Sequence, residues 1–358
     1  MSKYWNDKVK EIEPYVPGEQ PKDKKYIKLN TNENPYPPSE KVMEAMKNAV
    51  NDDLRLYPDP TCGDLICEIA NYYKLNKDEV FIGNGSDEIL AFSFMAFFSN
   101  TKKILFPDIS YTFYKVYAGL FNLDYELIKL DGNFDIPLEK FKKQNGGVII
   151  PNPNAPTGKY VDTEKLRKLV EANKDNVVII DEAYIDFGGE SMAKFIHDYD
   201  NLLVVQTLSK SRALAGIRVG FALGHKDLIE GLNRIKNSIN SYTIDRVALA
   251  GAKEAIKDNE YFERITKKII NTREKTSKNL EKLGFKVLES RSNFVFASHK
   301  KVSGKFLYET LKEHGVLVRY FNKDRIDNFL RITIGTDAEM DILVGELNLI
   351  LSQYLNRA

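Results

Sequence analysis

Cysteine and histidine are scarce in this 358-residue sequence, which contains two cysteines and four histidines. Cys62 and Cys67 lie five positions apart without forming a CxxC pair, and the histidines are scattered along the chain. This pattern argues against a disulfide framework and against a zinc cluster. We therefore expect no metal site, and any chemistry must come from other side chains.

Net charge and long apolar runs are also lacking. The 52 basic and 51 acidic residues nearly cancel, which leaves no field to attract nucleic acid or an anionic membrane. The longest apolar run, Ile89 to Phe98, is interrupted by Ser93 and is too short to span a bilayer. The first residues have no apolar core of a secretory signal, so we expect a cytoplasmic protein.

The hydrophobic pattern predicts two domains behind an arm. Residues 1–29 are polar, rich in lysine and punctuated by proline, which indicates an arm that packs on a partner subunit. From Glu79 onward, short β-branched runs alternate with helical stretches, which is typical of an α/β domain with a mostly parallel sheet and helices on both faces. Residues 30–246 are expected to form this large domain, and residues 247–358 a smaller α+β domain.

Polar and reactive residues stand where the predicted strands end. Because the carboxyl ends of parallel strands meet at one edge of a sheet, these residues are expected to share a cleft. They are the stretch GNGSDE (83–88), the stretch PDISY (107–111), Asn152 to Asn154, Asp181 with Tyr184, and Ser209 with Lys210.

The stretch GNGSDE has two interpretations. It is a glycine turn that opens a helix, whose free amide N–H groups can hold a phosphate. Alternatively it is an ordinary helix start with Ser86 or Asp87 as the N-cap. Glu88 occupies the place where a dinucleotide fingerprint needs its third glycine, so the stretch favours one phosphate over two.

Asp181 directly follows four β-branched residues, VVII. A carboxylate in such a poorly solvated position needs a cationic or proton-donating partner, and a pyridinium nitrogen would meet that need. Tyr184 is close enough in sequence to reach the same ligand. The structural alternative is that Asp181 caps a helix and Tyr184 packs in the core.

Lys210 follows the strand-like stretch NLLVVQTL, where a lone lysine is usually solvated. Its amine becomes nucleophilic only when the pKa falls well below about 10.4, through desolvation or a neighbouring cation such as Arg218. A Schiff-base role would explain the setting. Ser209 and Arg218 would then bind the phosphate of the same ligand.

Taken in order, SDE, Tyr111, PNPNAPTG, DEAY and SKSRALAGIRVG resemble the fold-type I pyridoxal-phosphate enzymes of the aspartate aminotransferase class, over nearly the whole chain. Within that class the chain is similar to the histidinol-phosphate aminotransferase family. The motifs that carry this closer resemblance are PYVPG, LNTNENPYPPS, RLYPDP, TLSKSRALAGIRVG, GVLVRYF and LRITIGT.

The resemblance implies roles for the strand-end residues. Lys210 would bind the aldehyde of pyridoxal 5'-phosphate and later move the proton between the substrate and the cofactor, and Asp181 would keep the pyridine nitrogen protonated. Many relatives have asparagine where this chain has Ala155, so the amide that contacts the ring is expected from Asn154. The remaining implied contacts are Tyr184 with the phenolic oxygen, Tyr111 on the ring face, and Gly85, Ser86, Asp87, Ser209 and Arg218 around the phosphate.

The resemblance also implies a homodimer, in which Tyr57 reaches the phosphate held by the partner subunit. Both substrates of such an enzyme, glutamate and a phosphorylated amino alcohol, are anions. Arg331 resembles the residue that binds a substrate carboxylate, and Arg319 one that meets the substrate phosphate; alternatively, these arginines pair with Asp324 or Asp327. Asn32 and Tyr15 come from an amino-terminal segment that resembles a substrate lid.

The expected reaction is reversible amino transfer between histidinol phosphate and 2-oxoglutarate, in histidine biosynthesis. Three other functions remain open: an aminotransferase for aromatic amino acids, threonine-phosphate decarboxylase, and a cofactor-sensing regulatory module. No helix-turn-helix segment or basic extension precedes Asn30, which argues against the regulatory module.

Overall fold

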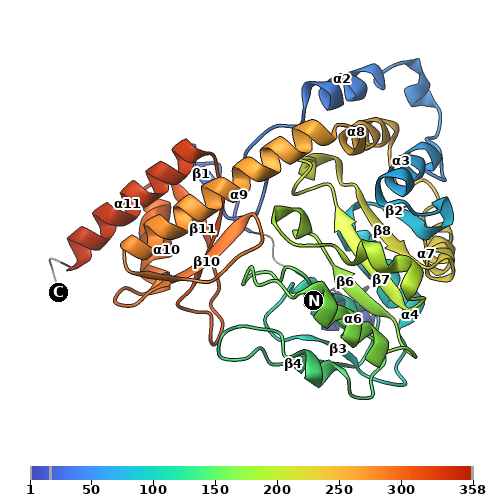
Figure 1. Ribbon diagram of the computed structural model, residues 1–358, viewed down its shortest axis with the longest axis horizontal. Helices are drawn as coiled ribbons and strands as arrows, with labels where there is room; N and C mark the ends of the chain where they lie inside the picture. The colour runs from blue at the N-terminus through green and yellow to red at the C-terminus, as the bar shows by residue number, and fades with distance from the viewer. Residues whose placement is uncertain (1, 16–17, 356–358) are drawn as a thin grey trace.

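The computed structural model describes residues 2–15 and 18–355, which form two bodies of unequal size. Figure 1 shows the larger body around one sheet and the smaller body around another, with the long helix α9 (Asn259–Lys282) running between them. A short helix, α1 (Asp7–Glu11), lies near the start of the chain.

The larger sheet has seven strands in the order β2-β8-β7-β6-β5-β3-β4. Strand β8 runs antiparallel to both of its neighbours, and the other pairs are parallel. The prediction of a mostly parallel sheet is therefore confirmed. The strands are β2 (Val80–Gly83), β3 (Ile104–Pro107), β4 (Tyr125–Ile128), β5 (Val148–Pro151), β6 (Val178–Asp181), β7 (Leu202–Thr207) and β8 (Gly220–Gly224).

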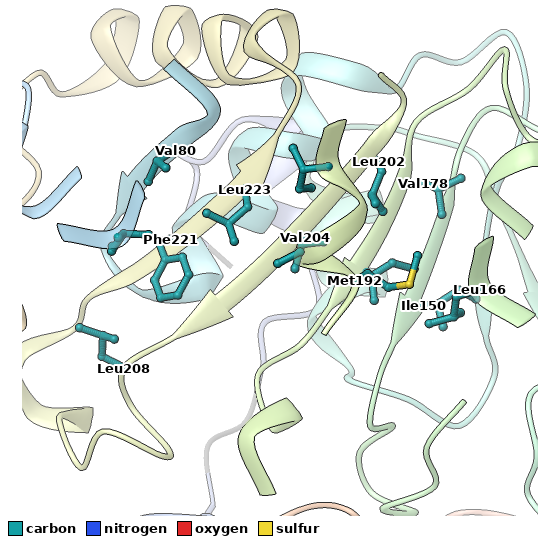
Figure 2. Close-up of a cluster of buried hydrophobic side chains, with 14 of the residues drawn as sticks. Val80, Ile150, Leu166, Val178, Met192, Leu202, Val204, Leu208, Phe221 and Leu223 are labelled. Atoms are coloured by element: carbon teal, nitrogen blue, oxygen red, sulfur yellow. The ribbon is translucent and has the colours of Figure 1, made fainter. Parts of the chain in front are cut away.

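Both faces of this sheet are buried, because successive strand residues point to opposite sides. Val178 and Ile180 join the core cluster drawn in Figure 2, whereas Ile179 joins the cluster on the other face. Residues of α2 (Glu40–Asn48), α3 (Gly63–Tyr73), α6 (Thr163–Ala172) and α8 (Arg246–Lys257) belong to the first cluster. Residues of α4 (Gly85–Phe97), α5 (Phe113–Leu120) and α7 (Lys226–Ile239) belong to the second.

The smaller sheet has five strands in the order β1-β11-β12-β10-β9. Its first strand comes from the segment that was expected to be an arm: β1 pairs in parallel with β11, and Ile27 lies opposite Val316. The elements are β1 (Ile27–Leu29), β9 (Phe285–Val287), β10 (Phe294–His299), β11 (Val316–Tyr320), β12 (Leu330–Thr333), α10 (Gly304–Glu313) and α11 (Asp337–Leu355).

Helix α8 packs with the larger body, although the sequence placed it in the smaller domain. Ala248, Ala252 and Ile256 are buried in the core cluster of the large sheet. Because α9 contributes Ile269 and Leu280 to the core of the smaller sheet, we infer that the division lies between α8 and α9. Single-turn 3₁₀ segments occur at Asp52–Arg55, Lys77–Glu79, Leu138–Phe141, Ile185–Phe187 and Ala215–Ile217, and a longer one at Met192–Asp198.

The apolar run from Ile89 forms most of α4, which packs on the large sheet. Throughout residues 2–15 and 18–355, every helix is either too short or too polar to cross a membrane.

Candidate active site

A cavity of about 420 Å³ lies where the carboxyl ends of the large-sheet strands face the smaller body. Residues from the amino-terminal segment, from the large sheet and from strands β11 and β12 line it together. Of the residues that the sequence singled out, the cavity is lined by Tyr15, Asn32, Ser86, Asp87, Tyr111, Asp181, Tyr184, Ser209, Lys210, Arg218, Arg319 and Arg331.

The amino-terminal end of α4 opens into this cavity without a side-chain cap. Its N-cap residue is Asn84, whose side chain makes no capping hydrogen bond, so the alternative with Ser86 or Asp87 as N-cap is wrong. Gly85 has φ +75°, and a Cβ on it would come within 2.6 Å of Nη2 of Arg218. The turn therefore needs glycine both for its backbone angle and for the close approach of the guanidinium.

The Asp87 carboxylate binds other side chains of the cavity instead of capping the helix. Its Oδ1 accepts a 2.6 Å hydrogen bond from the Tyr111 hydroxyl, and its Oδ2 lies 3.1 Å from Nη2 of Arg218. Arg218 also donates from Nη1 to Oγ of Ser209 over 3.4 Å. A guanidinium, a hydroxyl and uncapped amides thus converge as they do in phosphate-binding sites.

Asp181 ends β6, and its side chain is 6% exposed. Oδ2 accepts a 2.6 Å hydrogen bond from the Tyr114 hydroxyl, and Oδ1 accepts one of 3.2 Å from the Ala183 N–H. Burial raises the pKa of Asp181 to about 6, although these two hydrogen bonds lower it. Asp181 caps no helix, because the following 3₁₀ turn has Tyr184 at its N-cap position.

Sequence reasoning missed Tyr114. It is fully buried and gives Asp181 its shortest hydrogen bond. The available signal was the aromatic run that begins at Tyr111 and continues into α5. Tyr111, which precedes α5, turns toward Asp87, and Tyr114 in α5 turns toward Asp181, so this segment supports two carboxylates of the cavity.

Lys210 turns into the cavity from the loop after β7. Its Nζ lies 3.4 Å from the Thr31 carbonyl oxygen and 5.9 Å from the centre of the Tyr184 ring. The loop is held by Asn34, whose Nδ2 donates to the Lys210 carbonyl over 2.9 Å. The Tyr184 hydroxyl accepts a 3.0 Å hydrogen bond from Nδ2 of Asn32. The segment after β1 therefore forms a wall beside the lysine.

Two arginines from the smaller body face the same cavity. Arg319 on β11 and Arg331 on β12 lie directly opposite each other in register. Nη2 of Arg331 donates to the Asn30 carbonyl over 2.8 Å, while its buried Nε has no hydrogen-bond partner among the described residues. Burial lowers the pKa of Arg331. Like charges in this arrangement repel, so the pair favours an anion in the cavity.

Asp324 and Asp327, the alternative partners of these arginines, are exposed to solvent. Within the described part of the chain, neither Asp324 nor Asp327 forms an ion pair with Arg319 or Arg331, and the arginine of that loop that does pair with a carboxylate is Arg325. The two cavity arginines lie instead near the aromatic ring of Phe321, at 5.6 and 5.7 Å from its centre.

Asn154 does not line the cavity, which corrects the ring contact expected of it. The side chain is fully buried, and Nδ2 donates to the Ile109 carbonyl and to Oγ1 of Thr157, both over 3.0 Å. Both amide hydrogens therefore serve the loop itself. Ala155 and Pro156 line the cavity at this point, and neither side chain has a hydrogen-bond donor.

Tyr57 also lies outside the cavity of its own chain. Its side chain is 78% exposed and stacks on Tyr242, with ring centres 4.6 Å apart. Tyr15, by contrast, lines the cavity and stacks on Phe113 at 4.4 Å. The next two residues of the motif PYVPG, at positions 16 and 17, lie outside the described residues.

Comparison with known proteins agrees with this geometry. Residues 24–347 match the family of class I and II aminotransferases. A histidinol-phosphate aminotransferase of Clostridium beijerinckii is 80% identical over 98% of each chain, and one of Clostridium acetobutylicum is 62% identical over 97% of this chain and 99% of its own.

Solved structures give the same picture. A crystal structure of another histidinol-phosphate aminotransferase from Clostridium acetobutylicum is 28% identical with a TM-score of 0.84, covering 91% of this chain and 99% of that one. The enzyme from Sinorhizobium meliloti, solved in complex with pyridoxal-5'-phosphate, has a TM-score of 0.89 at 22% identity and covers 99% of both chains. This chain therefore belongs to the class I and II aminotransferases and, within them, to the histidinol-phosphate aminotransferase family.

Proposed function

We propose that the protein is a histidinol-phosphate aminotransferase. It transfers an amino group reversibly between L-histidinol phosphate and 2-oxoglutarate, giving imidazole-acetol phosphate and L-glutamate, as a step of histidine biosynthesis. The observation that carries the proposal is the facing pair Arg319 and Arg331, which lines the same cavity as Lys210. Both amino donors carry an anionic group for these arginines, and the names of the relatives agree.

The cavity fits pyridoxal 5'-phosphate as the cofactor. The uncapped start of α4, with Ser209 and Arg218 beside it, suits a phosphate. Asp181 is buried and its pKa is raised, so a protonated pyridine nitrogen would relieve its desolvation. The Lys210 amine faces the same space. When bound, pyridoxal phosphate supplies an electron-withdrawing ring that stabilises negative charge at the substrate α-carbon.

Each lining residue then has a task. Lys210 would hold the cofactor aldehyde, and its Nζ, once free, would move a proton from the substrate α-carbon to the cofactor. Asp181 would accept a hydrogen bond from the protonated ring nitrogen, and Tyr114 fixes the direction of its carboxylate. The Tyr184 hydroxyl, which accepts a hydrogen bond from Asn32, would contact the phenolic oxygen. Tyr111, which donates to Asp87, would lie against the ring face.

The substrate anion binds between the smaller body and the amino-terminal wall. Arg331 holds the carboxylate of glutamate or 2-oxoglutarate, and Arg319 meets the phosphate of histidinol phosphate. Charge-assisted hydrogen bonds from these guanidinium groups favour amino donors whose anionic group reaches Arg319 or Arg331. Tyr15 and Asn32 line the same cavity.

Replacing Lys210 by alanine should remove the covalent attachment of the cofactor. The purified wild-type protein is expected to show visible absorbance from lysine-bound pyridoxal phosphate, and Lys210→Ala should lose this band and fall by about 10³-fold or more in amino transfer. Lys300→Ala, which changes an exposed lysine, is the control and should keep both properties. A colourless wild-type protein that does not bind pyridoxal phosphate would refute the proposed function.

Cofactor binding should weaken at low pH through Asp181. The pKa of Asp181 is raised to about 6, so the cofactor-free protein is stabilised by the protonated carboxyl, and this stabilisation disappears as the pH rises through about 6. A pyridinium requires the ionised form, so cofactor affinity is expected to decrease as the pH falls below about 6. The variant Asp181→Asn should bind cofactor weakly at every pH.

Asp181→Asn should also stabilise the cofactor-free protein above pH 6, by up to about 3 kcal/mol, because it removes a desolvated charge. Thermal unfolding of both proteins at pH 5 and pH 8, together with cofactor titration, checks the two effects. Equal cofactor affinity of the wild type at pH 5 and pH 8 would contradict this role of Asp181.

Comparison of amino donors should separate the proposed reaction from its alternatives. Histidinol phosphate is expected to be the best donor to 2-oxoglutarate, ahead of phenylalanine and tyrosine, and phosphothreonine should release no carbon dioxide. Arg319→Gln should lower kcat/KM for histidinol phosphate by about 10- to 100-fold, the value of a charged hydrogen bond, and affect phenylalanine much less. Faster turnover of phenylalanine by the wild type would favour the aromatic aminotransferase.

We propose that the active form is a homodimer in which Tyr57 reaches the cofactor phosphate of the partner subunit. Tyr57 is too exposed to serve its own cavity, and exposed apolar residues surround it in the sequence, including Val50, Leu54 and Leu56. The stacked rings of Tyr57 and Tyr242 are both exposed, and a second copy would cover them.

Sedimentation is therefore expected to give twice the mass of one chain. Tyr57→Phe should weaken cofactor binding by about tenfold, through loss of one hydrogen bond to a charged group, without dissociating the dimer. Tyr354→Phe, at another exposed tyrosine, is the matched control. A monomer with full activity would contradict both the dimer and the role of Tyr57.

We infer a cytoplasmic location from the proposed reaction, because histidinol phosphate and imidazole-acetol phosphate are intermediates of amino-acid biosynthesis. The two cysteines of the protein are free, as is usual in a reducing compartment. Cell fractionation would test this location.

A further inference from the structure

Arg325 has an unusual backbone conformation for its residue type. It lies in the loop between β11 and β12 and has φ +70°, in the left-handed region that favours glycine. A long side chain in this conformation costs about 1 kcal/mol or more and persists only where its surroundings hold it. The contacts of the Arg325 side chain show what holds it.

The guanidinium of Arg325 crosses from the smaller body to the larger one. Nη1 lies 3.0 Å from Oδ2 of Asp108, and Nη2 donates to the carbonyl oxygens of Leu130 and Asp131 over 2.8 and 3.0 Å. The guanidinium also lies 5.7 Å from the ring centre of Phe134. All four partners belong to the larger body, so one side chain connects the two bodies through a directed set of hydrogen bonds.

On the larger body, this contact supports the part of the cavity that holds the cofactor. Oδ1 of Asp108 accepts hydrogen bonds from the N–H groups of Ile109 and Leu130, which fixes the loop after β3. The same loop continues to Tyr111, which lines the cavity and donates to Asp87. Asp108 therefore links Arg325 to the loop that lines the edge of the cofactor site.

On the smaller body, Arg325 lies in the loop that joins the two strands carrying the substrate-binding arginines. Arg319 precedes the loop on β11 and Arg331 follows it on β12. A shift of the loop relative to Asp108 would therefore move both guanidinium groups relative to Lys210. The arginines must bind the substrate anion while its reacting group meets the cofactor, so a misplacement of about 1 Å would cost about 100-fold in kcat/KM.

We propose that Arg325 is a positioning residue, which sets the distance between the substrate-binding arginines and the cofactor site through Asp108 and the carbonyls of Leu130 and Asp131. This proposal rests on the proposed aminotransferase function. It assigns Arg325 no contact with substrate or cofactor, because Arg325 does not line the cavity.

The loop does not need Arg325 in order to fold. Ile326 and Phe329 are buried at 2% and 9% exposure, and Phe329 stacks on Phe296 with ring centres 4.6 Å apart. These apolar contacts hold the loop against the core cluster of the large sheet, where Phe329 also packs on Phe134 with ring centres 5.3 Å apart. The guanidinium of Arg325 adds hydrogen bonds of fixed direction to this contact. Loss of the side chain should therefore change geometry more than it changes stability.

The variant Arg325→Gly tests this directly, because glycine removes the guanidinium and also relieves the left-handed backbone. We expect kcat/KM to fall by about 10- to 100-fold for histidinol phosphate and for 2-oxoglutarate, with most of the change in KM. The visible absorbance of the bound cofactor and the cofactor affinity should change by less than about twofold.

Arg291→Gly is the matched control. Arg291 also joins the two bodies, donating from Nη1 to the Gly188 carbonyl over 2.8 Å, but its side chain is 45% exposed and it does not line the cavity. Its kinetic constants should stay within about twofold of the wild type. If Arg325→Gly behaves like Arg291→Gly while the wild type transfers amino groups, the proposal is overturned.

Two further variants cover a failure of Arg325→Gly to fold. Arg325→Lys keeps the charge near Asp108 but loses the fork that reaches both carbonyls, so KM should again rise for both substrates. Asp108→Asn should raise KM in the wild-type background and add little to Arg325→Lys, because both changes break one contact. Fully additive effects would show that the two residues act separately. A wild type without amino-transfer activity would instead refute the proposed function, and with it the role of Arg325.

Discussion

The buried carboxylate of Asp181 is the constraint on which the cavity depends. It stands at the end of a central parallel strand, where both faces of the sheet are covered and solvation is poor. A rise of its pKa from 3.8 to about 6 corresponds to a net penalty of about 3 kcal/mol for the charged form, after its hydrogen bonds have offset part of the desolvation. The fold tolerates this cost because Tyr114 and the Ala183 N–H stabilise the carboxylate in one direction, which leaves it oriented for a cation in the cavity.

The remaining charges are arranged around that carboxylate by the topology of the chain. Arg218 reaches the cavity from the short connection before β8, while Arg319 and Arg331 reach it from the other sheet. Positive charge therefore accumulates at two separated places, one beside α4 and one between β11 and β12. A ligand that is anionic at both ends and cationic in the middle matches this pattern, which is the charge distribution of pyridoxal phosphate joined to an anionic amine.

Much of this arrangement could be predicted from the sequence, because a polar residue after an apolar run marks the carboxyl end of a buried parallel strand. Asp181 and Lys210 both follow apolar runs, so their positions on the rim were predictable from pattern alone. The direction of a side chain in a proline-rich loop has no such periodicity. For this reason the inward orientation of Asn154 was not predictable, although its place in the chain was.

Contacts between distant segments were the other limit. Hydrophobic pattern does not say which strand of a later domain will accept Ile27, and it does not distinguish Tyr114 from other aromatic residues of α5. The left-handed conformation of Arg325 leaves no trace in composition either, since arginine has no preference for it. These features come from tertiary packing, which selects among conformations that local sequence leaves open.

The parallel pairing of β1 with β11 has a consequence for how the cavity is assembled during synthesis. The wall formed by Thr31, Asn32 and Glu33 begins directly after β1, and β1 pairs with a strand that starts at Val316. Strand β1 therefore has no strand to pair with until nearly all of the remaining residues have been synthesised. The wall beside Lys210 is a late product of translation, and a chain that stops before β11 would lack it even though it contains every residue of that wall.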